Sequence, residues 1–323
     1  MHASSVDSEL WDLPAEGTEM QLRVLKLLSL VVRSHHPHIL APSSITVVSP
    51  SSSSSNPPAL HLQFPRATTA LSLRDATKQG LLRSGAARRR IAFQLLSTVA
   101  FMHHRRIFHN FLTSDEILLS GVVTPEVGNN DMSTQSILLT HFFQSSITPV
   151  SSASYMCSRN YRPPEVILGY KASSEHVDIW LLGCLLFEIA TGDAMFSLIS
   201  SKDNGVMKPM LVRQQIQQIV TDIGTVSSED VPSDFAAKHR DAVLSMKGEW
   251  QMLKRLEDAQ VESAQDWNSL LLACLAFNPE KRQGAATLLK SALFNDLIST
   301  EAVHDYVEFE TVDEAIASSA VES

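Results

Sequence analysis

The chain has 323 residues, 44% of them hydrophobic and 19% charged, which is the composition of a folded domain with a sizeable core. Its formal net charge of −9 argues against a nucleic-acid-binding face as the main function, so we expect no nucleic-acid partner. The longest apolar run, residues 179–187, falls well short of the roughly 20 residues that span a bilayer, so we expect no membrane partner either.

The cysteines and the amino terminus indicate an intracellular protein. Cys157, Cys184 and Cys274 are far apart and form no C-x-x-C pair, so the sequence indicates neither a disulfide framework nor a zinc ribbon. Residues 1–19 are acidic and lack the basic start and apolar stretch of a secretory signal. We therefore expect a cytoplasmic or nuclear location.

The first part of the chain predicts one helix followed by a pair of strands. Residues 19–32 carry apolar side chains at helical spacing, and the proline of the following SHHPH stretch ends that helix. Residues 44–48 and 59–64 are short runs of strand-favouring residues around a serine-rich loop at 49–58. We expect the two runs to pair antiparallel. Their exposed face should contact either the amino-terminal segment or another protein.

A second amphipathic helix is predicted at residues 87–106, and it leads into the loop IFHNFLTSDEILLS. The arginine triplet at 88–90 is interpreted as a solvated helix start rather than a binding patch. The apolar run that ends at Leu119 and the run SILLT at 136–140 are predicted to form a hairpin around a polar insertion.

The remainder of the chain is predicted to be mostly helical. Residues 175–192 predict a largely buried helix that ends at its final glycine, and residues 210–224 predict another helix. Residues 266–297 predict two helices joined through an Asn-Pro turn.

Three motifs in this helical part resemble those of eukaryotic protein kinases. The segment YMCSRNYRPPEVILGYKASSEHVDIWLLGCLLFEIATGDAMF, at 155–196, is similar to the end of the kinase activation segment and the helices after it. Within it, RPPE resembles the A-P-E element and VDIWLLGC the D-x-W-S-x-G helix. The stretch FNPEKRQGAATLLKSALF, at 277–294, resembles the arginine-bearing close of the domain. The likeness points to the CMGC-like branch, which contains the dual-specificity tyrosine-regulated, SR-protein and cyclin-dependent kinases.

The resemblance covers about Gln21 to Leu297 and implies the fold class. It implies a two-lobed α+β protein kinase-like fold, with a reduced amino-terminal β lobe and a mainly helical carboxyl-terminal lobe. The expected divisions are an amino-terminal segment at 1–15, a truncated N-lobe at 16–66, a kinase-like C-lobe at 67–298 and an acidic tail at 299–323.

The resemblance also implies structural roles for several residues that are retained. Glu165 would pair with Arg282 across the interior of the larger lobe. Asp178 would accept backbone hydrogen bonds from the catalytic loop, in which His109 is kept, and so hold the shape of that loop.

Other retained positions face substrates or partners in the kinase family. Arg159 and Arg162 match residues that shape the substrate-facing loop. Tyr155 stands where relatives carry a phosphorylatable tyrosine, so it is a candidate phosphorylation site, with a partly buried ring as the alternative. Residues 197–265 contain the insertion that this branch uses for docking partners.

The catalytic positions carry different chemistry. From His109 onward the family pattern H-R-D-L-K-P-E-N is here H-N-F-L-T-S-D-E. Phe111 replaces the aspartate that accepts the substrate proton, and a phenyl ring has no basic site. Thr113 replaces the lysine that steadies the γ-phosphate, and Glu116 replaces an asparagine that holds a metal ion.

The nucleotide side is degenerate as well. His141 takes the position of the magnesium-binding aspartate of D-F-G, although imidazole is a poor ligand for that cation. Gln21 matches the ion-pairing glutamate of the first helix, with Glu19 as a less well aligned candidate. There is no G-x-G-x-x-G loop, and no lysine precedes Lys26. We therefore predict a pseudokinase without catalytic residues or cofactor, which acts as a scaffold or regulator of a protein partner such as an active kinase or its substrate.

Two alternatives remain open at this point. The chain can be a divergent or truncated serine/threonine kinase that transfers phosphate from ATP to protein, with Asp115 or Glu116 holding magnesium. A metal protein built on the SHHPH histidines or on His109 is the other alternative. Because no cysteine or acid lies nearby at known ligand spacings, we expect no metal site.

Overall fold

The computed structural model describes ten stretches of the chain. These are residues 8–12, 36–42, 44–48, 59–63, 71–82, 84–120, 136–140, 150–151, 157–196 and 209–297. The helix expected at residues 19–32 and the positions Gln21, His141 and Tyr155 lie outside the described residues, as do the serine-rich loop and the acidic tail.

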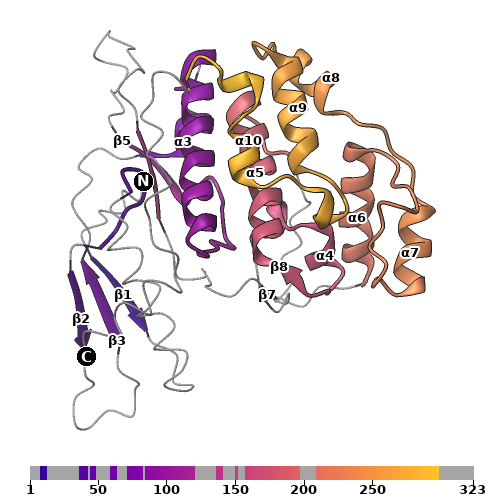
Figure 1. Ribbon diagram of the computed structural model, residues 1–323, viewed down its shortest axis with the longest axis horizontal. Helices are drawn as coiled ribbons and strands as arrows, with labels where there is room; N and C mark the ends of the chain where they lie inside the picture. Colours follow the sequence, from indigo (N-terminus) through magenta and orange to yellow (C-terminus); the bar gives the residue numbers. More distant parts are fainter. Residues whose placement is uncertain are drawn as a thin grey trace.

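A three-stranded antiparallel sheet lies at one end of the molecule (Figure 1). Strands β2 (Ser44–Val48) and β3 (Ala59–Gln63) pair antiparallel, which confirms the predicted strand pair. Strand β1 (Ser8–Asp12) pairs with the other edge of β3. The amino-terminal segment thus contacts the predicted pair through an edge of β3, and β3 becomes the central strand.

A second sheet joins the small lobe to the helices. It has the order β4 (Leu71–Ser72), β5 (Ile117–Ser120) and β6 (Ser136–Leu139), and the β5–β6 pairing confirms the predicted hairpin. The turn at 36–42 attaches to this sheet, because the Leu40 N–H donates to the Leu139 carbonyl at 2.9 Å and the Leu139 N–H donates to the His38 carbonyl at 2.8 Å.

Helix α3 (Gly85–His104) packs against α5 (Ser174–Thr191) in the centre of the larger lobe (Figure 1). The amphipathic pattern predicted for α3 is incomplete, because every side chain from residue 91 to residue 96 is buried. Among them is Gln94, whose side-chain carbonyl accepts the N–H of Ile137 at 3.1 Å. The Gln94 side chain therefore supplies a hydrogen-bond acceptor to an N–H of the edge strand β6 and does not face water.

Helix α5 is buried along nearly its whole length and ends as the sequence predicts. Gly192 follows its last turn with φ = 89°, a left-handed conformation that glycine adopts without a steric penalty. Its Gly183 lies against the side chains of Cys274 and Leu275, and the Cβ atom of a larger residue would lie less than 3 Å from both. Close approach of α5 to the end of helix α9 (Ala264–Cys274) therefore depends on this glycine.

The far end of the molecule is helical (Figure 1). The first helix predicted within 266–297 is present as α9, but the second is only the four-residue α10, set between two 3₁₀ turns. Because proline lacks an N–H and Gly284 gives extended backbone before α10, a long second helix does not form. The larger-lobe helices at this end are α6 (Pro209–Ile223), α7 (Ala237–Leu244), α8 (Met252–Asp258), α9 (Ala264–Cys274) and α10 (Ala285–Leu288).

Short elements complete the described chain. Helix α2 (Leu73–Lys78) is capped by Ser72, whose hydroxyl accepts the N–H of Asp75 in the first turn. The other short elements are α4 (Pro164–Ile167), β7 (Val150–Ser151), β8 (Ala172–Ser173) and the 3₁₀ turns at Arg159–Tyr161, Pro279–Lys281 and Ala292–Phe294. Across the described stretches, no helix combines the length and apolar character needed to span a membrane.

The arginine triplet at the start of α3 makes contacts within the chain. Arg88 donates to the carbonyls of Leu82 and Ala190, at 2.7 Å each. Arg89 lies 3.3 Å from the carboxylate of Asp296. These contacts hold the start of α3 against α5 and the end of the lobe, so two of the three arginines serve packing.

Candidate functional site

The loop after α3 is held by one carboxylate of α5. Asp178 is fully buried, and its Oδ1 accepts the N–H of Asn110 at 2.7 Å while its Oδ2 accepts the N–H of His109 at 2.8 Å. The His103 ring, on α3, lies 3.0 Å from the same Oδ2. Asp178 therefore makes the backbone contacts expected from the sequence and fixes the path of the loop.

His109 links the loop to the end of β6. Its Nε2 lies 3.0 Å from the carbonyl of Thr140, and its Nδ1 lies 3.4 Å from the N–H of Phe111. Because a backbone N–H can only donate, Nδ1 accepts and Nε2 carries the hydrogen given to Thr140. The histidine is thus a neutral, fully buried structural group.

Phe111 stands at the position where the kinase resemblance places the catalytic base. Its side chain is half-buried, and it lies between Asn110 and the fully buried Leu112. Asn110 has φ = 64°, a left-handed conformation that asparagine tolerates better than most residues. The backbone of a catalytic loop is therefore present, and the side chain at its central position cannot accept a proton.

Cys157 connects this loop to the segment before α4, a contact that sequence reasoning missed. It has φ = 72°, and its thiol donates to the Asn110 carbonyl at 3.3 Å. The Arg162 guanidinium in turn donates to the Cys157 carbonyl at 3.1 Å. Burial raises the pKa of the Cys157 thiol well above its usual value, with the nearby Asp178 carboxylate acting in the same direction. The thiol form that this hydrogen bond needs is therefore favoured.

A second unpredicted network runs through the position where the family carries proline. The hydroxyl of Ser114 lies 3.1 Å from that of Tyr161, which donates to the buried Glu188 carboxylate at 2.5 Å. Burial, followed by the negative charge of Glu188, raises the pKa of Tyr161 far above its usual value. No periodicity signals such a contact, since the partners come from three different elements.

The acidic residues of the loop lie in different surroundings. Asp115 is exposed and pairs with Arg74 of α2, 2.6 Å away. Glu116 is buried, and its carbonyl accepts both the N–H and the hydroxyl of Thr140, at 3.0 and 2.9 Å. Thr113 is also buried and uncharged. The two carboxylates considered as magnesium ligands therefore differ sharply in exposure.

Glu165 and Arg282 are paired in the interior, as the sequence analysis expects. Two hydrogen bonds of 2.7 and 2.8 Å join the guanidinium to the carboxylate. Arg282 also lies over the ring of Trp180, 5.0 Å from its centroid. A bidentate pair with this much surrounding contact fixes α4 against the helical lobe.

The two arginines of the substrate-facing loop contribute differently. The carbonyl of Arg159 accepts the side-chain amide of Gln215 on α6 at 2.7 Å, so its backbone is tied to α6. Arg162 is half-buried, and burial lowers the pKa of its guanidinium. The segment that contains both arginines is therefore tied to α6 through the Arg159 carbonyl and to Cys157 through the Arg162 guanidinium.

Two histidines of the SHHPH stretch, His36 and His38, contact neighbouring residues. The His36 ring lies 4.5 Å from that of Phe101, and His38 Nδ1 lies 2.9 Å from the hydroxyl of Ser136. Among the described residues no three His, Cys, Asp or Glu side chains converge as a metal site would require.

Comparisons with known proteins agree with this geometry. The family model for the protein kinase domain matches residues 17–294. Cyclin-dependent kinase 14 of Mus musculus is 27% identical over 209 residues, which is 64% of this chain and 39% of that protein. Serine/threonine-protein kinase AFC3 of Arabidopsis thaliana is 36% identical over 117 residues, which is 32% of this chain and 28% of that protein.

The matched part of the chain thus spans about two fifths of the length of the first of these curated relatives and less of the other. The small sheet and the larger helical lobe fit the two-lobed kinase architecture with a reduced N-lobe. The family model, the relatives and the buried framework around Asp178 and Arg282 lead to one conclusion. This chain belongs to the eukaryotic protein kinase family, in its CMGC-like branch.

Proposed function

We propose that this chain is a pseudokinase, which binds other proteins and does not transfer phosphate. The observation that carries the proposal is the loop held by Asp178, whose backbone contacts are intact while Phe111 occupies the position of the base. A general base must accept a proton from the substrate hydroxyl, and a phenyl ring has no atom that can do so.

The side chains around the loop also support the proposal that no magnesium–nucleotide cofactor binds. Magnesium prefers octahedral coordination by oxygen, mostly from carboxylates, waters and phosphates. Here Asp115 is paired with Arg74, and the buried Thr113 offers no positive charge for a phosphate. Phosphoryl transfer depends almost entirely on positioning and charge stabilisation, so these losses act on the same step.

The proposed role is that of a scaffold or regulator of a protein partner. One kind of partner is an active kinase, and another is the substrate of such a kinase. The preserved Glu165–Arg282 pair and the anchored segment at Arg159 maintain the face on which kinases meet other proteins, and this supports a binding role. The likeness to a cyclin-dependent kinase favours a protein partner over a small molecule.

The second candidate function is a divergent or truncated serine/threonine kinase that uses ATP and magnesium. The carboxylates of Asp115 and Glu116, four and five residues after Phe111, favour this candidate. For catalysis, Asp115 would have to leave Arg74, or Glu116 would have to become accessible.

A thermal-shift titration with ATP, with and without magnesium, separates the two candidates. Binding at 100 times the dissociation constant stabilises a folded protein by about 2.7 kcal/mol, which raises the melting temperature by a few degrees. We expect no shift at millimolar nucleotide in either condition. An active cyclin-dependent kinase serves as the positive control, and a magnesium-dependent shift in this chain would overturn the proposal.

A further inference from the structure

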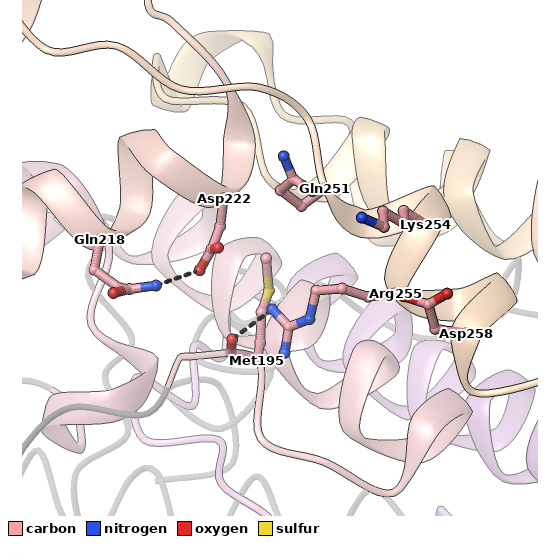
Figure 2. A pocket seen from close by; sticks show the side chains of 7 residues that line it. All are labelled: Met195, Gln218, Asp222, Gln251, Lys254, Arg255 and Asp258. Atoms are coloured by element: carbon pink, nitrogen blue, oxygen red, sulfur yellow. Dashed lines mark hydrogen bonds between the residues drawn. The ribbon is translucent and has the colours of Figure 1, made fainter.

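A surface pocket of about 370 Å³ opens between the end of α6 and helix α8 (Figure 2). Ligand pockets in proteins have volumes of roughly 300–1,000 Å³. Helix α5 rises about 20 Å between Asp178 and Thr191, so the pocket lies at the opposite end of α5 from the catalytic loop. Besides Met195, its lining consists of two carboxylates, two cations and two carboxamides: Asp222, Asp258, Lys254, Arg255, Gln218 and Gln251.

Hydrogen bonds fix the walls of this pocket. The N–H of Gln251 donates to the Asp222 carbonyl at 2.9 Å, which ties the start of α8 to the end of α6. Arg255 donates to the carbonyls of Met195 and Ala194, at 2.9 and 3.3 Å, and its guanidinium lies 4.2 Å from the centroid of the Phe187 ring. The pocket is therefore preformed, and a ligand would bind without first ordering its walls.

Asp222 presents an unused acceptor to the pocket. Asp222 is 9% exposed. Its Oδ2 accepts the side-chain amide of Gln218 at 2.9 Å (Figure 2). Within the stretches that the structure describes, Oδ1 has no hydrogen-bond partner and the carboxylate has no ion pair. Burial raises the pKa of Asp222, against the opposing effects of Gln218 and Arg255. A buried carboxylate with an oxygen that lacks a hydrogen bond is stabilised when a further N–H or O–H group donates to that oxygen.

Arg255 presents the complementary donor. A guanidinium carries five N–H groups, and here two of them reach the backbone carbonyls of Met195 and Ala194. The other N–H groups of Arg255 have no acceptor in the described part of the chain. The pocket thus holds a separate acceptor and a separate donor, and its two acidic and two basic side chains balance in formal charge.

We propose that this pocket binds an uncharged primary carboxamide, the group that a glutamine or asparagine side chain carries. The amide NH₂ group would donate to Asp222 Oδ1, and the amide carbonyl would accept from the Arg255 guanidinium.

The charges in the pocket explain the choice of an uncharged group. An ammonium or guanidinium ligand would satisfy Asp222 but would bring a further cation beside Arg255 and Lys254. A carboxylate ligand would meet the same difficulty with Asp222 and Asp258, and either ion would also lose its hydration on entry. A primary amide both donates and accepts, so it satisfies both sides of the pocket without adding charge. The inference does not depend on whether the chain is a pseudokinase, since the catalytic loop takes no part in it.

Methyl NMR of the full-length chain, with carbon-13 in its methionine methyl groups, tests this proposal because Met195 lines the pocket. Three blocked amino acids serve as probes: the N-acetyl, N-methylamide forms of glutamine, lysine and glutamate. We expect the glutamine probe alone to shift the Met195 signal, with saturation at millimolar concentration. A response confined to the lysine probe or to the glutamate probe would overturn the proposal, and so would the absence of any response.

A matched pair of variants locates the binding. Asp222→Leu removes the acceptor with a side chain of similar size and should weaken binding of the glutamine probe at least tenfold. Asp241→Leu, on the exposed side of α7, should leave it unchanged. Unchanged affinity in Asp222→Leu would contradict the proposal. The remaining methionine signals show whether the variant is folded. If it is not, the comparison of the three probes on the unmodified chain still tests the proposal.

Discussion

Glu165 and Arg282 lie 117 residues apart in the chain and form a buried ion pair with two hydrogen bonds, 2.7 and 2.8 Å long. Glu165 is 2% exposed and Arg282 is 5% exposed. Arg282 also donates to the carbonyls of His176 and Ala276, so one guanidinium joins the start of α5, the end of α9 and helix α4. Removal of either charge would leave the other one buried without compensation.

We expect Glu165→Gln and Arg282→Met each to reduce the free energy of unfolding by about 3–5 kcal/mol. In the double variant no uncompensated charge remains, so its loss should be clearly smaller than the sum of the two single losses. Urea unfolding of the four proteins provides the measurement. Strictly additive losses would show that the two residues stabilise the fold independently.

Phe111→Asp should not create a kinase. The substitution restores a proton acceptor at the centre of the loop, but it supplies neither a positive charge at Thr113 nor a metal ligand. Transfer of radiolabelled phosphate from ATP to a generic protein substrate provides the measurement, with Phe111→Leu as the matched control. Phosphate transfer by the aspartate variant alone would mean that the nucleotide side is functional and would contradict the pseudokinase proposal.

The three cysteines should not react in the folded protein. Cys157, Cys184 and Cys274 are buried, and burial raises the pKa of each thiol, that of Cys274 to about 12. Since the thiolate is the reactive form, a colorimetric disulfide reagent at pH 8 should label none of them. In guanidinium chloride the same reagent should label all three. Rapid labelling of one thiol without denaturant would identify a segment that opens locally.

The same thiols give a pH dependence of stability with a definite sign. In the unfolded chain they ionise near their usual pKa of about 8.5, whereas in the folded chain they stay protonated to much higher pH. Their contribution is therefore complete below about pH 8.5 and is lost as pH rises above it. We expect the free energy of unfolding to fall between pH 8 and pH 10. Cys157→Ser should show a smaller fall than the unmodified chain.

Substitutions at two glycines distinguish the cost of overpacking from the cost of a left-handed backbone. A Cβ atom at Gly183 would lie 2.7 Å from Leu275 Cδ2 and 2.8 Å from the Cβ of Cys274. Gly183→Ala should therefore destabilise the chain by about 1–3 kcal/mol through overpacking. Gly169 has φ = 80°, and a methyl group added there would meet no atom within 4 Å, so Gly169→Ala should cost only about 1 kcal/mol, from the left-handed backbone. Thermal unfolding of both variants gives the comparison, and equal losses would contradict it.

The sequence is informative about elements whose signal is local. Residues 44–48 and 59–63 carry strand-favouring side chains around a polar loop, and they pair as expected. Helix α5 is predominantly apolar and ends at a glycine, so both its burial and its end are predictable. The Glu165–Arg282 pair is foreseen only because the flanking motifs resemble those of a family, since no periodicity links residues 117 positions apart.

Features that depend on tertiary contacts are not foreseen. The polar residue Gln94 makes α3 look amphipathic, yet it is buried because an N–H at the edge of β6 needs an acceptor. The left-handed backbone at Asn110 and Cys157 depends on a contact between two loops, and neither residue is a glycine that would signal it. The pocket beside α8 is equally hidden, because its polar side chains come from separate parts of the chain.

The attachment of the turn at 36–42 to β6 has a mechanical consequence. Both of its backbone hydrogen bonds converge on one residue, Leu139, from the neighbouring His38 and Leu40. The side chains of His38 and His36 add contacts to Ser136 and Phe101, so the turn is held at several points and acts as a clamp. The small lobe should therefore stay fixed to β6 and α3 at this turn when a protein binds.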